Sequence, residues 1–197
     1  SLRNMLGVVE DFLDQPQQVG QHYAEQPRLQ TIDTQTVVHH LIQEYQATAV
    51  QKGLHMSVDV QGNVQGDTTR IAQVISNLLS NAIKYSPTDG DIIITSERRA
   101  GMWRLSIRDY GPGIPEAERE SLFQPFSQIS TQPTGGETST GLGLWIVAEM
   151  MRMQGGRVGV THLRDGTCFW IELPLAETDL SSRHSSSGPA SAGAAFS

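Results

Sequence analysis

Apolar side chains recur at helical spacing in three segments of the chain. The strongest pattern lies in 67–85, where the three- and four-residue steps continue for more than three turns. Asp67, at the start of that segment, is a suitable N-cap. Weaker patterns predict helices over 37–49, ended near Gly53, and over 141–153.

Alternating apolar and polar positions predict strands between these helices. The predicted strands are a weak one at 28–33 and further ones at 55–60, 91–97, 102–109, 157–162 and 167–173. Turn residues at Ala100-Gly101 and at Arg164-Asp165-Gly166 predict tight connections within the last two pairs of strands.

The two ends of the chain lie outside this globular pattern. An apolar stripe over 1–14 is typical of the end of a longer helix in a bundle, and the Gln-rich segment 15–27 is interpreted as a connector. One domain is predicted over 28–176. The segment 177–197, rich in Ser, Gly and Ala, is predicted to be a disordered tail or linker.

Composition and net charge limit the kinds of partner that this chain can bind. With 197 residues, 38% of them hydrophobic, the chain is sufficient for one packed core. No apolar run approaches the roughly 18–20 residues of a membrane helix, so we expect a soluble segment without membrane contact. The net charge of −7 and the pI of about 5.3 argue against nucleic acid as a partner.

Three polar residues interrupt the strongest helix on one side. Asn77, Asn81 and Lys84 are spaced at i, i+4 and i+7 and therefore project from one narrow arc. Such an arc could offer an amide oxygen to a hard cation and a positive charge to a phosphate. The alternative is an ordinary solvated helix face.

A carboxylate ends the strand predicted over 102–109. Asp109 has the parity of the strand's apolar side chains and is therefore predicted to point inward. A buried carboxylate needs hydrogen-bond donors, such as the exocyclic amine of a ligand. Gly111 and Gly113 follow and would let a flat ligand approach the backbone. The alternative is a simple Asp-Gly turn.

A Gly-rich loop over 134–144 runs directly into the last predicted helix. Unpaired N–H groups and the helix dipole make such a junction a ready anion site, whereas a flexible loop is the simpler interpretation of the glycines alone.

Together these segments resemble the ATP-binding domain of bacterial sensor histidine kinases, in the Bergerat (GHKL) superfamily of ATPases. The four matching boxes are Asn77–Tyr85 (N box), Asp109–Ile114 (G1 box), Phe123–Phe126 (F box) and Gly141–Leu144 (G2 box). The resemblance implies an α/β fold, a Bergerat-type two-layer sandwich in which helices cover one face of a mixed sheet, with a mobile ATP lid over 127–140.

The resemblance also implies roles for individual residues. On the phosphate side it assigns Asn81 to Mg²⁺, Lys84 to the phosphates and Tyr85 to the ribose–phosphate side, with Asn77 as a further catalytic residue. Asp109 would accept the adenine amino group and Thr167 would join through water. The remaining implied nucleotide contacts are Gly111, Gly113, Ile114, Phe126, Thr140, Gly141, Leu142, Gly143 and Leu144.

The implied activity is transfer of the γ-phosphoryl group of ATP to a histidine. None of the six histidines has the expected acceptor setting, so the acceptor is predicted in an upstream dimerisation domain, as part of a homodimer. A response regulator receiver domain is the implied partner and the cytoplasm the implied location, with a membrane anchor of the full-length protein left open.

Two alternatives stand beside this interpretation. The predicted lid, 127–140, has no Lys or Arg, which favours a non-catalytic nucleotide-sensing module. Another enzyme of the superfamily, a serine kinase or an ATPase, is the second alternative. Asn77 counts against it, because related ATPases have a water-activating Glu at the matching position.

Overall fold

The computed structural model describes residues 26–125, 127 and 143–176. The helix predicted over 1–14, most of the connector, the lid and the tail lie outside this range. In chain order the elements are β1 (Gln30–Asp33), α3 (Thr34–Gln51), β2 (His55–Asp59), β3 (Asn63–Gly66), α4 (Thr68–Tyr85), β4 (Asp91–Arg99), β5 (Met102–Asp109), the 3-10 turn η1 (Glu116–Glu118), α5 (Gly143–Met153), β6 (Arg157–Leu163) and β7 (Gly166–Pro174).

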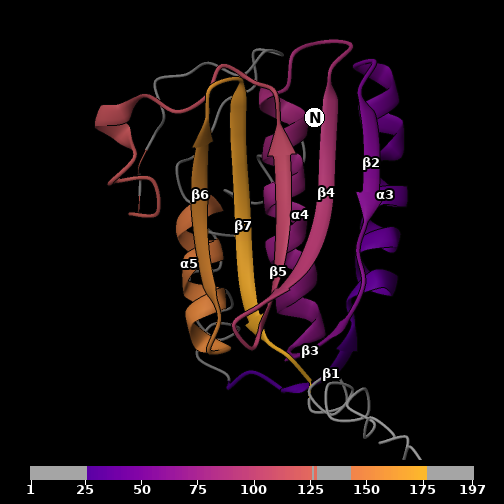
Figure 1. Ribbon diagram of the computed structural model, residues 1–197, viewed down its shortest axis with the longest axis vertical. Helices are drawn as coiled ribbons and strands as arrows, with labels where there is room; N and C mark the ends of the chain where they lie inside the picture. Colours follow the sequence, from indigo (N-terminus) through magenta and orange to yellow (C-terminus); the bar gives the residue numbers. More distant parts are fainter. Residues whose placement is uncertain (1–25, 126, 128–142, 177–197) are drawn as a thin grey trace, which may run out of the picture.

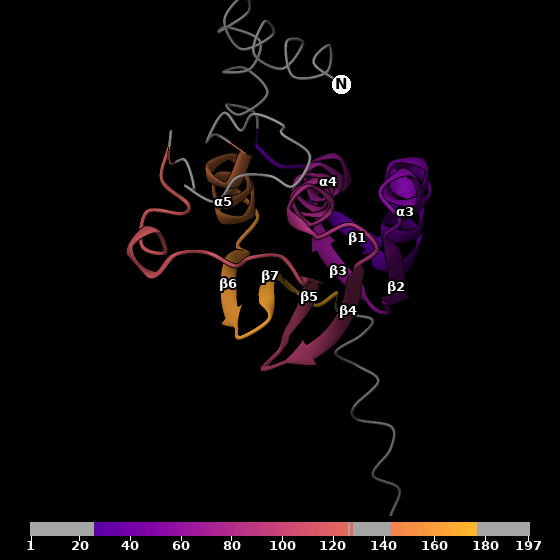
Figure 2. The same cartoon turned by 90° about the horizontal axis from the view of Figure 1, so that it is seen from above.

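Five of the strands form one mixed sheet with the order β2-β4-β5-β7-β6. β2 runs parallel to β4, and the other neighbours are antiparallel. Figure 2 shows α3, α4 and α5 together on one face of this sheet. The expected two-layer α/β architecture, with helices covering one face of a mixed sheet, is therefore confirmed.

The central helix α4 packs between α3 and α5 and buries its apolar stripe against the sheet. Its N-cap is Asp67, as predicted, and the Asp67 carboxylate accepts hydrogen bonds from the backbone N–H groups of Thr69 at 3.1 Å and Arg70 at 3.2 Å. The helix ends where Ser86 adopts an extended conformation before Pro87. Sequence and structure agree on this element because local capping and long-range burial act in the same direction.

A small second sheet, formed by β1 and β3, closes the domain at one end (Figure 1). β3 was not predicted, because its four residues show no apolar alternation and its partner residues in β1 lie thirty or more positions away. The end of the domain is tied to the same place: Val64 forms a bridge with Leu175, and the Ala176 N–H donates to the Asn63 carbonyl at 3.0 Å.

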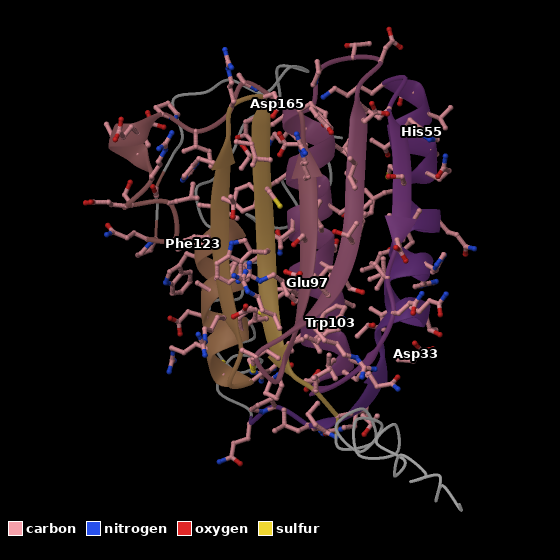
Figure 3. The ribbon with its side chains drawn as sticks, viewed as in Figure 1. Asp33, His55, Glu97, Trp103, Phe123 and Asp165 are labelled. Carbon is pink, nitrogen blue, oxygen red and sulfur yellow. The ribbon has the colours of Figure 1, made fainter. Side chains whose placement is uncertain are left out.

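Two side chains fix the ends of the central strands. Trp103, at the start of β5, is fully buried, and its indole N–H donates to the Gln61 carbonyl at 2.8 Å (Figure 3). At the other end Arg108 pairs with Asp165 of the β6–β7 turn at 3.0 Å. The end of β5 is thereby held next to the start of β7. No helix within the described ranges combines the length and the apolar character that crossing a bilayer requires.

Candidate functional site

The polar arc on α4 faces the beginning of α5. Asn77 and Asn81 are both half-buried. The Asn77 side-chain N–H donates to the Gln73 carbonyl at 3.2 Å, which fixes the amide. Its oxygen points toward α5, because a Cβ added at Gly143 would lie 3.4 Å from Oδ1 of Asn77. The structure thus brings together the predicted N box and the last part of the G2 box.

Lys84, the third residue of the polar arc, lies on the side of α4 that faces α3. The residue lines a groove of about 300 Å³ between α3 and α4, together with Tyr45, Ser80 and Thr88. Lys52, the C-cap residue that follows α3, closes the end of α4 by donating to the carbonyls of residues 83 and 84 at 2.6 and 2.9 Å. This cap was not predicted, because the contact joins two helices and leaves no periodic signal in either. It neutralises the partial negative charge at the helix C-terminus.

Asp109 is buried at the end of β5, with only 3% of its surface exposed. Its parity prediction is confirmed, since the burial of β5 alternates and Asp109 falls on the buried side. The Gly111 N–H donates to its carboxylate at 2.9 Å. Burial raises the pKa of Asp109 to about 6, and hydrogen bonds from the backbone of Gly111 and Thr167 act against that increase. An ionised carboxylate accepts up to about four hydrogen bonds, so a ligand amine can still bind.

Glycine is required where three chain segments meet around this carboxylate. A Cβ at Gly111 would lie 2.5 Å from the carbonyl oxygen of Tyr85, so no side chain fits between the end of α4 and the segment after β5. Gly113 has a φ of +79°, which an L side chain rarely adopts. A Cβ at Gly166 would overlap the carbonyl of Asp109. The two glycine positions of the predicted G1 box are therefore both sterically justified.

Thr167 lies beside Asp109 on the neighbouring strand β7. The two residues are direct partners in the β5–β7 register, and Thr167 is buried. Ile114, also buried, follows the glycines. The structure thus brings the predicted adenine-side residues together.

The remaining predicted positions are only partly described. Gly143 and Leu144 form the first turn of α5, half-buried, and Phe123 of the F box packs against the core. Phe126, Thr140, Gly141 and Leu142 lie outside the described residues.

The geometry defines a class of protein. A buried carboxylate and a threonine sit at the sheet end, two glycines allow close approach, and an amide-bearing helix faces the start of a second helix. Close approaches join these parts from three distant stretches of sequence: a Cβ at Gly143 would meet Asn77, and one at Gly111 would meet the Tyr85 carbonyl and the Asp109 carboxylate. This is the arrangement of a nucleotide-binding α/β domain.

Comparison with known proteins identifies the family. Residues 66–177 match the family model described as histidine kinase-, DNA gyrase B- and HSP90-like ATPase. The sensor protein PfeS of Pseudomonas aeruginosa is 36% identical over 121 residues, which are 61% of this chain and 26% of PfeS. The sensor histidine kinase RcsC of Escherichia coli is 34% identical over 176 residues, 87% of this chain and 18% of RcsC.

Solved structures agree with these sequence matches. The mycobacterial sensor histidine kinase MprB superposes with a TM-score of 0.68 at 27% identity, covering 74% of this chain and 98% of that chain. The histidine kinase ThkA, in a complex with the response regulator protein TrrA, gives a TM-score of 0.70 at 24% identity, covering 89% of this chain and 50% of that chain. At that identity the second match supports the fold alone.

The chain belongs to the histidine kinase-, DNA gyrase B- and HSP90-like ATPase family, as the catalytic, ATP-binding domain of a sensor histidine kinase. It spans about a quarter of PfeS and less than a fifth of RcsC.

Proposed function

We propose that this domain transfers the γ-phosphoryl group of ATP to a histidine in an upstream dimerisation domain of the same protein. The observation that supports this best is that α4 approaches both the start of α5, through Asn77 and Gly143, and the segment after Asp109, through Tyr85 and Gly111. Phosphoryl transfer needs positioning and charge neutralisation more than covalent chemistry, so a rigid cleft is what the domain has to supply.

Each wall of the cleft has its own task. Asp109 accepts the adenine amino group, Thr167 assists through water, and the glycines allow the base to lie close to the backbone. Lys84 pairs with phosphate, and the amides at the start of α5 bind phosphate oxygens. Asn77 has an amide where a water-activating base would be needed, so spontaneous hydrolysis of ATP is slow.

The site also fits a magnesium ion bound together with the triphosphate. The described parts of the chain contain no cluster of three or more His, Cys, Asp or Glu residues that could hold a metal by themselves. Mg²⁺ in such sites keeps several waters and binds one or two protein oxygens plus phosphates. Because Asn77 is fixed through its nitrogen, its oxygen faces the cleft, and Asn81 one turn later presents a second amide. Asn81 would hold the ion, which would neutralise phosphate charge when bound.

The proposed function extends to segments and partners beyond the domain. Residues 1–14 are interpreted as the end of a dimerisation helix, 15–27 as the connector to it, and 177–197 as a tail or linker. A response regulator receiver domain is the proposed acceptor of the phosphoryl group in the next step. ThkA, a structural neighbour, has been crystallised with such a protein.

Phosphotransfer to a supplied acceptor tests the proposal. The chain is incubated with γ-labelled ATP, Mg²⁺ and the His-containing helical bundle that precedes it, and acid-labile phosphate on the bundle is measured. A bundle with its acceptor histidine changed to Gln is the control. Label on the histidine is the expected result. Binding of ATP without any labelling would contradict kinase activity and support the nucleotide-sensing alternative, which the composition of 127–140 favours.

A further inference from the structure

Tyr110 is the first residue of the chain beyond the end of β5. Asp109, just before it, is the last residue of that strand with register partners on both neighbouring strands. The residues from Tyr110 to Gly113 include two glycines, and glycine loses more conformational entropy on ordering than any other residue. Tyr110 stands between Asp109 and Gly111, whose N–H donates to the Asp109 carboxylate. A contact that holds Tyr110 therefore constrains the backbone on both sides of that hydrogen bond.

The ring of Tyr110 is held by Arg108. Strand parity places Arg108 on the sheet face opposite to Asp109, and its guanidinium carbon lies over the Tyr110 ring, 4.4 Å from the centroid. A cation within about 6 Å of an aromatic face is attracted by the ring quadrupole. The Nε atom of Arg108 is buried and has no hydrogen-bond partner in the described part of the chain. The contact with the ring thus offsets part of the cost of desolvating this guanidinium.

The turn between β6 and β7 touches the same place. Its residue Asp165 accepts from Nη2 of Arg108 at 3.0 and 3.1 Å (Figure 3). The Asp165 side chain is 62% exposed, and exposed ion pairs contribute little to stability. Gly166 follows, where a Cβ would lie 2.9 Å from the Cα of Tyr110. The backbone of Tyr110 thus packs against this turn, and its ring packs against Arg108.

We propose that Tyr110 is a positioning residue for recognition of the base, and that its contact with Arg108 holds the segment after β5 in the binding conformation. This inference rests on the proposed binding of ATP beside Asp109. Tyr110 acts through its neighbours and does not touch the nucleotide. With the ring held, the Gly111 N–H orients the Asp109 carboxylate before the base arrives. Without that contact the competent conformation is populated only part of the time, and the affinity falls in proportion.

Five single variants separate the ring of Tyr110 from its surroundings. Tyr110→Leu removes the aromatic face, Tyr110→Phe keeps it, and Arg108→Gln removes the cation. Asp165→Asn removes the exposed charge and leaves both members of the stack in place. Trp170→Leu is the matched control, because it removes a second arginine–aromatic contact of the same sheet, with Arg104 at 4.1 Å, in the middle of β7. All variants are made in the complete chain.

Each protein is titrated with ATP and with purine riboside triphosphate, which lacks the 6-amino group, and exchange of the Gly111 amide is measured without nucleotide. We expect Tyr110→Leu and Arg108→Gln each to weaken ATP binding about two- to fivefold, the effect of one exposed cation–π contact, and to weaken the analogue less. The Gly111 amide should exchange faster in both. The other three variants should match the wild type. The double variant should be no weaker than either single one, because both remove the same contact.

Any of four results would overturn the inference. They are an unchanged ratio of the two dissociation constants in Tyr110→Leu, unchanged exchange of the Gly111 amide, additive losses in the double variant, and an equal loss of ATP affinity in Trp170→Leu. If Tyr110→Leu does not fold, the comparison of Arg108→Gln with Asp165→Asn decides the question. Wild-type protein that binds neither nucleotide would overturn the proposed function itself, and with it this role for Tyr110.

Discussion

In the proposed function, recognition of the base depends most directly on Asp109. Its carboxylate is buried, oriented by the Gly111 N–H and paired in register with Thr167. An acceptor in this position would select a purine with a 6-amino group over one with a 6-oxo group. Asparagine could offer a donor at the same place, which would face the donor of adenine.

Asp109→Asn should therefore reduce the preference for ATP over GTP. The mismatch at a buried group is expected to cost ATP about 1–3 kcal/mol of binding free energy. Competition between ATP and GTP for the protein measures the change. Asp165→Asn, which removes the exposed partner of Arg108, is the matched control and should leave the preference intact. Unaltered competition in Asp109→Asn would show that Asp109 does not contact the base.

The same substitution should affect stability in a pH-dependent way. The pKa of Asp109 is raised from 3.8 to about 6 in the folded protein, so its favourable contribution is complete below pH 3.8 and is lost as pH rises through 6. At pH 7 the wild type thus contains an ionised, desolvated carboxylate, which the Asp109→Asn variant does not contain. Relative to its effect at pH 4, Asp109→Asn should add on the order of 2–3 kcal/mol to the unfolding free energy at pH 7. Urea denaturation at the two pH values measures this, and a pH-independent difference would contradict the raised pKa.

Single residues also mark the limit of what the sequence could predict about the site. The inward direction of Asp109 followed from strand parity, and the spacing of Asn77 and Asn81 followed from the helical repeat. The place of Lys84 beside the groove between α3 and α4 did not follow, because it depends on how α3 packs beside α4.

Among the elements, α4 contributes both to the stability of the domain, through its N-cap, and to the candidate site, through its polar arc. Its N-cap Asp67 accepts hydrogen bonds from Thr69 and Arg70 and one from the Arg28 N–H at 3.0 Å, and it donates its own N–H to Gln154 at 2.7 Å. The start of α4 is thereby joined to the incoming chain and to the residue after α5. The amide arc lies in the second half of the same helix.

Removing each of the two aspartate N-caps in a separate variant should distinguish the contribution of α4 to stability from its contribution to ATP binding. Asp67→Ala is expected to lower the unfolding free energy by about 1–2 kcal/mol. Asp33, the matched cap of α3, accepts within the described residues from the Gln35 N–H and the Thr36 hydroxyl, so Asp33→Ala should cost less. ATP affinity of the folded protein should be unchanged in both, because the caps lie at the far ends of their helices. Chemical denaturation and calorimetry measure the two quantities, and a larger loss in Asp33→Ala would contradict the assigned role of Asp67.

Elements were predictable where local and long-range preferences coincide. α4 has a cap, a continuous apolar stripe and a terminating Ser86-Pro87, and each signal is visible in the sequence. β3 has none of these signals, and it exists because β1 and the end of β7 lie beside it. The pairing of β5 with β7 across the intervening residues also required the fold, although both strands were predicted separately.

For the molecule as a whole, the arrangement separates the nucleotide cleft from the place where the chain enters and leaves the domain. The small β1–β3 sheet and Leu175 lie together at one end, and Asp109 stands at the other end of β5 (Figure 1). The proposed upstream acceptor domain can thus be attached without obstructing the proposed ATP site.

The central claim is that three distant stretches of the chain form one cleft for ATP. Titration of isotopically labelled protein with ATP and Mg²⁺, followed by amide NMR shifts, tests it most directly. The account predicts saturable shifts with one common affinity in three groups: 77–85, Asp109 to Ile114 with Thr167, and the start of α5 at Gly143. Shifts confined to one group, or none at millimolar nucleotide in folded protein, would contradict the account.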